Sequence, residues 1–334
     1  MKAILPAFLR TSFGLLALLL ALPLSAADAK KDIIEKTFTL TDSGKLISNV
    51  EAGSVTVTGG DSKSVMVKVT REAENANDTE AAKLLKDYEV ILSQDGNTIR
   101  ADGKAPRSNS WGWNKPRLKV KFEIIVPRKT DAEIGVSGGS AKIEDISGTI
   151  TTKTVGGSIN AAKLAGTVAL QTSGGSIHAE KLSGDLTAKT AGGSISLKTV
   201  EGGKVYASTS GGSIHITGGS GKFDLRTAGG SIKLEEGKGT VDARTSGGSI
   251  NVQLSEVPKE SMTLKTAGGG ISLKLPANTS ANLDSVAAGG SVTCDLPVVV
   301  QGKIKNSSIE GKLGDGGPEL NLRTSGGSIK VSKN

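Results

Sequence analysis

The chain has little cysteine and few aromatic residues. Cys294 is the single cysteine among 334 residues, so no intramolecular disulfide can form. Aromatic residues make up only 3% of the chain, which argues against a core of packed rings and favours a narrow core of Ile, Leu, Val and Ala. Cys294 alternates with Val292 and Leu296 in a strand-like segment, which indicates a buried, inert thiol rather than a reactive one.

The chain also lacks a block of like charge and a second hydrophobic run. Its net charge of +8 is spread along the sequence, which argues against a nucleic-acid-binding arm. Residues 1–27 have a basic start, an apolar run over 12–22 and small residues at the end, the pattern of a secretory signal peptide. The alternative is an N-terminal membrane anchor, but the apolar run is too short to span a bilayer. We therefore expect an exported protein, periplasmic or at the cell surface, without a transmembrane segment after signal removal.

Glycine, in contrast, is abundant, with 45 residues, many of them in a repeated phrase T-[SA]-G-G-S-I. The phrase returns at steps near 18 residues, and a degenerate copy at 307–309 would bring the total to about eleven. A fixed period of this length is typical of a solenoid. Close copies start at Thr172, Thr190, Thr209, Thr227, Thr245 and Thr324, and looser ones at Val136, Thr154, Thr266 and Ala287.

Within one repeat, apolar and polar residues alternate on both sides of the glycines, as in Ile177 to Glu180 and Asp185 to Lys189. This pattern predicts two short strands per repeat, each with one buried face. The Gly174–Gly175 pair and the separate Gly184 are expected to break the strands by taking positive φ. The apolar spacing does not fit a hexapeptide helix, and no aspartate recurs as a calcium β-roll requires.

The predicted fold is therefore all-β, a single-stranded right-handed β-helix of about 18 residues per coil and about 11 coils, because parallel crossovers are right-handed by default. Its repeat domain covers 131–334. Residues 28–130 are expected to form a β-rich N-terminal cap that covers the first coil. One short helix is predicted over 77–86, where Asn77 and Glu80 fit a helix start.

These features resemble the bacterial putative-adhesin β-solenoid family, exported domains of unknown function. The resemblance rests on the signal peptide, the segment Glu51 to Val57, the strand Phe122 to Pro127 and the serial G-G-S-I coils. It covers essentially the whole mature chain. It implies a β-helix outside the cytoplasm and brings no catalytic residues.

The position before each repeated Thr is mostly basic, and stacking would align it into one stripe. One interpretation is a groove for an acidic partner, an anionic glycan or other envelope polymer. The other, which the sequence favours, is that these outward charges keep a long β surface soluble. Trp111 and Trp113, in a polar loop, are a second candidate, either stacking on a sugar or sealing the end of the rod. The stripe comprises Lys153, Gln171, Lys189, Ser208, Arg226, Arg244, Lys265 and Arg323.

Other polar columns favour structure over chemistry. The repeated Thr and Ser are expected to form hydrogen-bonded ladders that close the turns. His178 and His215 share a repeat position but lie two coils apart, too far for one metal. The acidic residues of the repeats are not expected to fall in one column or to pair on neighbouring coils, which argues against acid–base catalysis. They are Glu180, Asp185, Asp224, Glu235 and Asp242.

We therefore predict a non-catalytic envelope module with no metal or cofactor that contacts an anionic polymer or a surface protein. Two alternatives stay open. One is a polysaccharide lyase or hydrolase, and the other is a structural rod that associates end to end, because the final residues 328–334 show no obvious cap.

Overall fold

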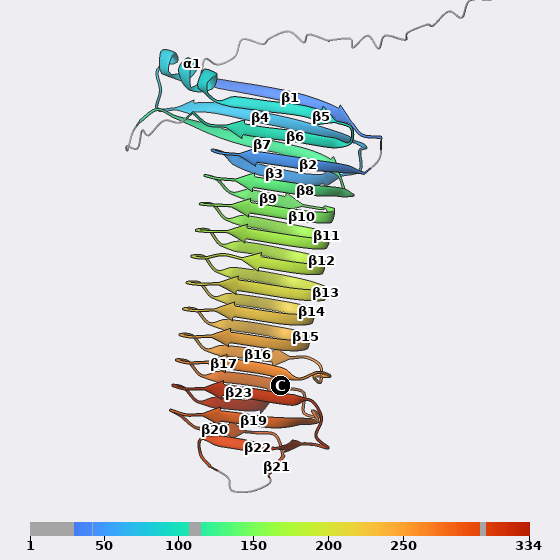
Figure 1. The fold of residues 1–334 in the computed structure, drawn as a ribbon, viewed down its shortest axis with the longest axis vertical. Helices are drawn as coiled ribbons and strands as arrows, with labels where there is room; N and C mark the ends of the chain where they lie inside the picture. The colour runs from blue at the N-terminus through green and yellow to red at the C-terminus, as the bar shows by residue number, and fades with distance from the viewer. Residues whose placement is uncertain (1–29, 42, 107–114, 301–304) are drawn as a thin grey trace, which may run out of the picture.

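The computed structural model describes residues 30–41, 43–106, 115–300 and 305–334. The predicted signal peptide, Trp111 and Trp113 lie outside the described residues. The described chain forms a long rod of stacked strands, with its one helix at the N-terminal end (Figure 1). An all-β fold is confirmed.

The strands fall into three groups along the rod. The N-terminal group is β1 (Lys31–Thr39), β2 (Gly44–Val50), β3 (Ser54–Gly60), β4 (Ser64–Glu74), β5 (Glu89–Asp95), β6 (Thr98–Lys104) and β7 (Arg117–Pro127), with α1 (Asp78–Asp87) between β4 and β5. The middle group is β8 (Thr130–Val136), β9 (Ala141–Glu144), β10 (Ser147–Thr154), β11 (Ile159–Thr172), β12 (Ile177–Lys189), β13 (Ile195–Thr209), β14 (Ile214–Thr227) and β15 (Ile232–Thr245). The C-terminal group is β16 (Ile250–Leu254), β17 (Met262–Thr266), β18 (Ile271–Leu275), β19 (Ala281–Ala287), β20 (Val292–Cys294), β21 (Val298–Val300), β22 (Ser308–Leu313), β23 (Glu319–Thr324) and β24 (Ile329–Lys333).

The middle strands pair in parallel, one repeat apart. Ile177 of β12 pairs with Ile159 of β11 on one side and Ile195 of β13 on the other. The two expected short strands of a repeat run on as one strand with a bend, where Lys163 and Lys181 have φ of 53° and 55°. We call the part after each Gly-Gly-Ser turn the first face of the coil, and the part before the next Thr the second face.

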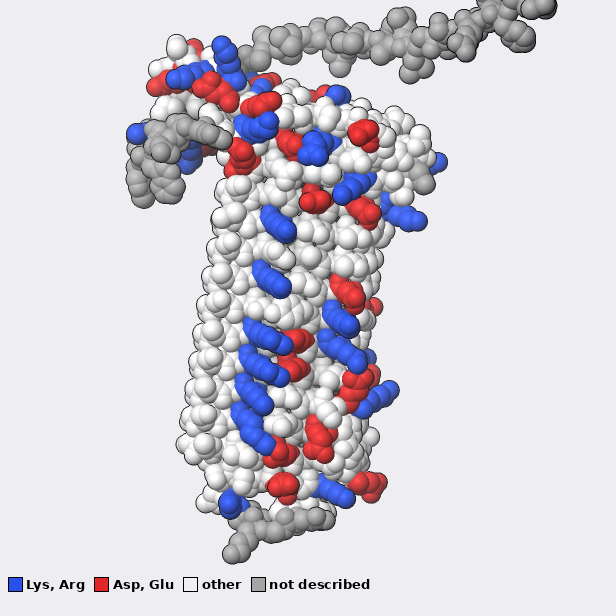
Figure 2. Space-filling model, in the orientation of Figure 1, with Lys and Arg blue, Asp and Glu red and all other residues white. Residues whose placement is uncertain are grey.

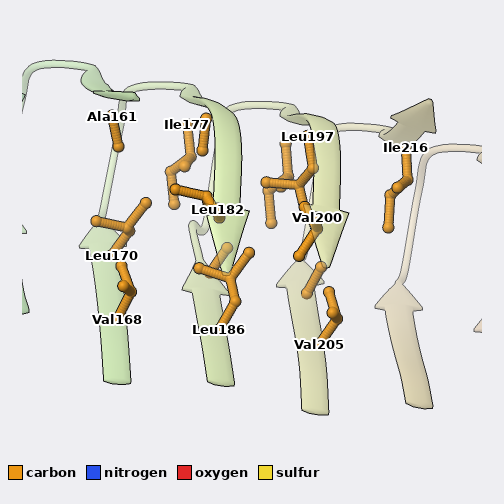
Figure 3. Close-up of a cluster of buried hydrophobic side chains, with 14 of the residues drawn as sticks. Ala161, Val168, Leu170, Ile177, Leu182, Leu186, Leu197, Val200, Val205 and Ile216 are labelled. Carbon is orange, nitrogen blue, oxygen red and sulfur yellow. The ribbon is translucent and has the colours of Figure 1, made fainter. Parts of the chain in front are cut away.

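The core is a thin column of aliphatic side chains between the two faces. Ile177, Leu182 and Leu186 of one coil are almost completely buried. In Figure 3 they point into the same interior as the corresponding side chains of the neighbouring coils. Burial of each side chain of this size contributes about 1.5–3 kcal/mol, and no single coil could provide its own cover.

The paired glycines are needed for close backbone approach. Neither Gly174 nor Gly175 has a positive φ, so that part of the prediction was wrong, whereas Gly184 does, at 105°. A Cβ on Gly175 would overlap the carbonyl oxygen of Gly157 in the preceding coil. A Cβ on Gly174 would lie 3.4 Å from its nearest neighbour, the Gly156 oxygen. The second glycine of each pair is therefore the one that stacking requires.

The repeated Thr closes this turn from the core side. The Thr172 hydroxyl donates to the Gly157 carbonyl of the preceding coil at 2.8 Å and accepts from the Gly175 N–H at 3.2 Å. The equivalent Thr-to-carbonyl bonds span 2.6 to 2.8 Å through the rod. The Ser column forms a second ladder, in which Ser176 N–H donates to Ser158 Oγ at 3.2 Å. The predicted hydrogen-bonded ladders are confirmed.

At the N-terminal end, the order of coils in space differs from their order in the chain. β2 pairs in parallel with both β6 and β8, and β3 with both β7 and β9. The 44–60 segment, expected within the cap, is therefore a coil of the rod, inserted between 98–127 and 130–144. Above it, the parallel stack ends in antiparallel pairs: β1 with β4, β4 with β7, and β5 with β6.

The predicted helix is present at this end. Asn77 Oδ1 accepts from Glu80 N–H, and Glu80 Oε2 accepts from Asn77 N–H, both at 2.9 Å, a capping box. On β1, Lys36 lies between the inward positions of Ile34 and Phe38; its Nζ donates to the Leu92 carbonyl at 3.1 Å and lies 4.9 Å from the Phe38 ring. Lys36 is exposed, and a lysine on an end strand discourages pairing with another chain.

The C-terminal end shows the same insertion. β23 pairs in parallel with β17 and β19, and β24 with β18 and β20. The last coil of the sequence thus lies inside the rod, and the expectation that it forms an uncapped end was wrong. Segment 307–309, read as a degenerate repeat, is not a parallel coil, because β22 runs antiparallel to β19 and β21.

The close contact at the second glycine predicts that alanine substitutions at the two positions of a pair differ sharply in their effect on stability. Gly175→Ala should lower the free energy of unfolding by about 2 kcal/mol or more, because the methyl group must push two coils apart. Gly174→Ala, its matched control, should cost less than half as much. Chemical denaturation of both variants would measure this, and equal losses would contradict the assigned role.

The inserted last coil predicts a non-local effect of truncation. Deletion of 319–334 removes one parallel partner each from β17 and β18 and the parallel partner of β19 and of β20. Amides of 281–313 should then exchange much faster with solvent, while those of β11 to β14 keep their protection. Hydrogen exchange with mass spectrometry would test this. Unchanged protection of 281–313 would contradict the inserted arrangement.

Candidate functional site

The predicted basic stripe is a true column on the second face. Successive members are register partners: Gln171 with Lys153 and Lys189, Ser208 with Lys189 and Arg226. The column continues through Arg226–Arg244, Arg244–Lys265 and Lys265–Arg323 pairs. Neighbours in such a ladder stand about 4.8 Å apart. Figure 2 shows a column of basic side chains running down one face of the rod. We call these eight residues the basic column.

The arginines of the column are held by aspartates. Arg226 donates from Nε and Nη2 to the two carboxylate oxygens of Asp224, at 2.7 and 2.9 Å. Arg244 forms the same fork with Asp242, at 2.9 and 2.8 Å. The hydrogen bond and charge of each aspartate raise the pKa of its arginine. These forks use residues two apart on one strand, which project to the same side.

Arg323 is held differently, across coils. It forms an ion pair with Asp284 of β19 and also donates to the Asp284 carbonyl at 2.9 Å. This contact depends on the insertion of β23 beside β19. All three arginines are therefore fixed in orientation and partly neutralised.

The lysines of the column keep their charge available. Within the described residues, Lys153, Lys189 and Lys265 form no ion pair, and all three side chains are exposed. Exposed ammonium groups without a partner stay fully hydrated and can exchange water for an anion at little cost. The basic column thus combines guanidinium groups held by aspartates with ammonium groups that form no ion pair in the described ranges.

Tyr206 belongs to this site, although sequence reasoning did not select it. Its ring lies 5.2 Å from Lys189 Nζ and 5.9 Å from Arg226 Cζ. It is the register partner of Thr187 and Asp224, in the column beside the basic column. A tyrosine at an outward position, in a chain with 3% aromatic residues, was the signal that could have found it.

The expectation that no carboxylates pair on neighbouring coils was wrong for one pair. Asp224 and Asp242 are direct register partners. Both oxygens of each carboxylate accept from an arginine, so ion pairing accounts for them. Glu180 and Glu235 share a column of the first face, but Lys198 and Thr217 separate them.

The histidines lie on the first face, away from the basic column. His178 and His215 both pair with Ser196, as predicted, and both are exposed. His215 Nε2 lies 2.8 Å from Glu235 Oε2. His178 lines a shallow groove of about 310 Å³ with Glu144 and Glu180. In the described part of the chain, no three His, Cys, Asp or Glu residues are grouped to hold a metal ion.

The described ranges contain no helix long and apolar enough to cross a membrane. Trp111 and Trp113 lie outside the described residues, so their predicted role stays a prediction.

The described residues thus define a class of protein: a rod of parallel-stacked β coils with polar columns along its faces. Within this class, the chain belongs to the family described as Toastrack DUF4097, whose model matches residues 45–332. The family resemblance inferred from the repeats is confirmed. No curated protein matches the chain.

Several solved structures are similar to this chain at low sequence identity. A putative adhesin from Parabacteroides distasonis is 12% identical, with a TM-score of 0.41, covering 91% of this chain and 97% of its own. A putative cell adhesion protein from Clostridium sporogenes is 12% identical, with a TM-score of 0.24, covering 91% and 100%. A putative lipid binding protein from Parabacteroides distasonis is 13% identical, with a TM-score of 0.32, covering 91% and 97%. These names describe those proteins.

Cys294 is partly buried, and its thiol donates to the Leu296 carbonyl at 3.5 Å. Burial, before any other cause, raises the pKa of the thiol. At pH 8 a smaller fraction is thiolate in the folded than in the unfolded protein, so iodoacetamide should react severalfold more slowly with the folded protein. Mass spectrometry of timed reactions would measure this. Equal rates in native and denaturing buffer would show that the thiol is reactive.

Proposed function

We propose that this chain is an exported, non-catalytic module of the cell envelope that binds an anionic polymer along its basic column. The observation that supports the proposal most is the register of the column, which brings six cations from separate repeats into one line. We also propose that the solenoid is right-handed, from the general rule for parallel crossovers.

An extended polyanion matches this arrangement. The column runs parallel to the rod axis, so a chain lying along it meets a new position at about every 4.8 Å. The aspartate forks keep the guanidinium groups in fixed positions, and the unpaired Lys153, Lys189 and Lys265 supply the net charge. Repeated weak contacts along one polymer add up to useful affinity without a deep pocket. If the column only preserved solubility, it would not need oriented arginines.

Catalysis has less support. The stacked Asp224 and Asp242 are the best candidate for an acid–base pair, and both are engaged by arginines. General acid–base work needs a carboxyl group with access to a substrate proton. We therefore retain binding as the function and leave lyase or hydrolase chemistry as the alternative.

End-to-end association into a longer rod has less support from the structure than from the sequence alone. The coil on which it was based lies inside the rod, between 262–275 and 281–294. At the other end of the rod, the end strand β1 carries the charged side chain of Lys36, which contacts the Leu92 carbonyl and the Phe38 ring and discourages pairing with another chain. Export itself is supported by the signal-like composition of residues 1–27.

The uncommitted lysines allow a direct test of polymer binding. Replacement of Lys153, Lys189 and Lys265 by Glu should weaken binding of the mature protein to anionic envelope polymers about tenfold or more at low salt. High salt should reduce the difference in affinity between the triple variant and the unaltered protein, because exposed charges are screened. Binding to immobilised envelope fractions at two salt concentrations would measure both effects.

The matched control moves the same charge elsewhere. Lys181, Lys198 and Lys274 are exposed lysines on or next to the first face and have no ion pair in the described ranges. Their replacement by Glu changes the net charge equally. If both triple variants lost the same affinity, the overall charge and not the basic column would be responsible, and the proposed site would be wrong.

A further inference from the structure

The basic column is not uniform along the rod, because Tyr206 lies beside one part of it. Within the described residues, the other aromatic rings, such as Phe122 and Phe223, are buried in the core. Tyr206 instead points outward from the second face and is partly exposed. The equivalent positions on the other coils carry no aromatic ring: they are Thr151, Ala169, Thr187, Asp224, Asp242, Thr263 and Asn321.

The neighbours of the ring are charged and come from both adjoining coils. Lys189 belongs to the preceding coil and Arg226 to the following one, at 5.2 and 5.9 Å from the ring centre. Both distances are within reach of cation–π attraction. The ring therefore fills the space between two cations and adds an aromatic surface that the equivalent residues of the other coils lack.

The side chains of Arg226 and Lys189 differ in how firmly their charged groups are held. Asp224 holds Nε and Nη2 of Arg226, which leaves Nη1 free of that fork. Lys189 has no ion pair in the described part of the chain, and its ammonium group lies over the ring. One donor is thus fixed in orientation and the other adjustable, on either side of an aromatic surface.

We propose that Tyr206, Lys189 and Arg226 form a subsite for one acidic sugar unit of the polymer, which rests on the function proposed above. The apolar C–H groups of a sugar ring pack on the tyrosine, as apolar surfaces do on aromatic rings. The acidic group of the same sugar, a carboxylate, sulfate or phosphate, accepts from Lys189 or Arg226. The subsite distinguishes a charged polysaccharide from a polyanion without sugar rings.

Tyr206→Thr is the decisive variant, because Thr187 occupies the equivalent position on the preceding coil, so a Thr here should leave the fold intact. Tyr206→Phe is the conservative partner, since it keeps the ring. The probes are polygalacturonate and dextran sulfate, which carry sugar rings with different acidic groups, and polyphosphate, which carries none. Affinities of the mature protein would be measured by calorimetry at one low salt concentration, with thermal melting as the folding control.

We expect Tyr206→Thr to bind the preferred acidic polysaccharide about fivefold more weakly and polyphosphate unchanged. Tyr206→Phe should bind as the unaltered protein does. The polysaccharide with the larger loss identifies the acidic group.

Equal losses on all three polymers, or no loss on any, would overturn the subsite. If the unaltered protein binds these polymers, the lysine triple variant loses them and Tyr206→Thr does not, only the subsite fails. If the unaltered protein binds none of the three, or if the lysine triple variant keeps its affinity, the proposed function fails as well.

Discussion

The structure depends on the approach of one backbone to the next at the second glycine of each repeat. There the carbonyl of one coil accepts the Thr hydroxyl of the following coil, and no Cβ fits between them. The bond and the steric limit act together, because the hydroxyl is in reach only when the coils are stacked closely. Repetition of this contact holds the coils in register and allows a column of thin aliphatic layers to exclude water.

The same register creates the surface. Side chains 18 residues apart in the sequence become neighbours about 4.8 Å apart, so a position that is basic in most repeats becomes a line of cations. The aspartates two residues earlier in the strand then lie beside the arginines and fix them. The candidate site therefore takes little from the stability of the fold, since its side chains occupy outward positions that are not needed for stacking.

Both ends of the rod use a coil from one place in the sequence to complete another. The 44–60 coil lies between 98–127 and 130–144, and the 319–333 coil lies between 262–275 and 281–294. Antiparallel strands then end the parallel stack at each side. Because an exposed parallel edge pairs readily with other chains, this arrangement protects the ends.

The repeat period and alternation were enough to predict the solenoid, the ladders and the basic column, and the capping residues Asn77 and Glu80 were enough to predict the helix. Each of these features depends on residues close in sequence or one fixed step apart. The inserted coils could not be predicted, since the repeat phrase of Thr324 looks the same wherever its coil stacks. The reason for the paired glycines, the Asp224–Asp242 pair and the role of Tyr206 also required three dimensions. Sequence determines which side chains a coil presents, whereas only the stacking order and the bends decide which of them meet, because those contacts form between coils.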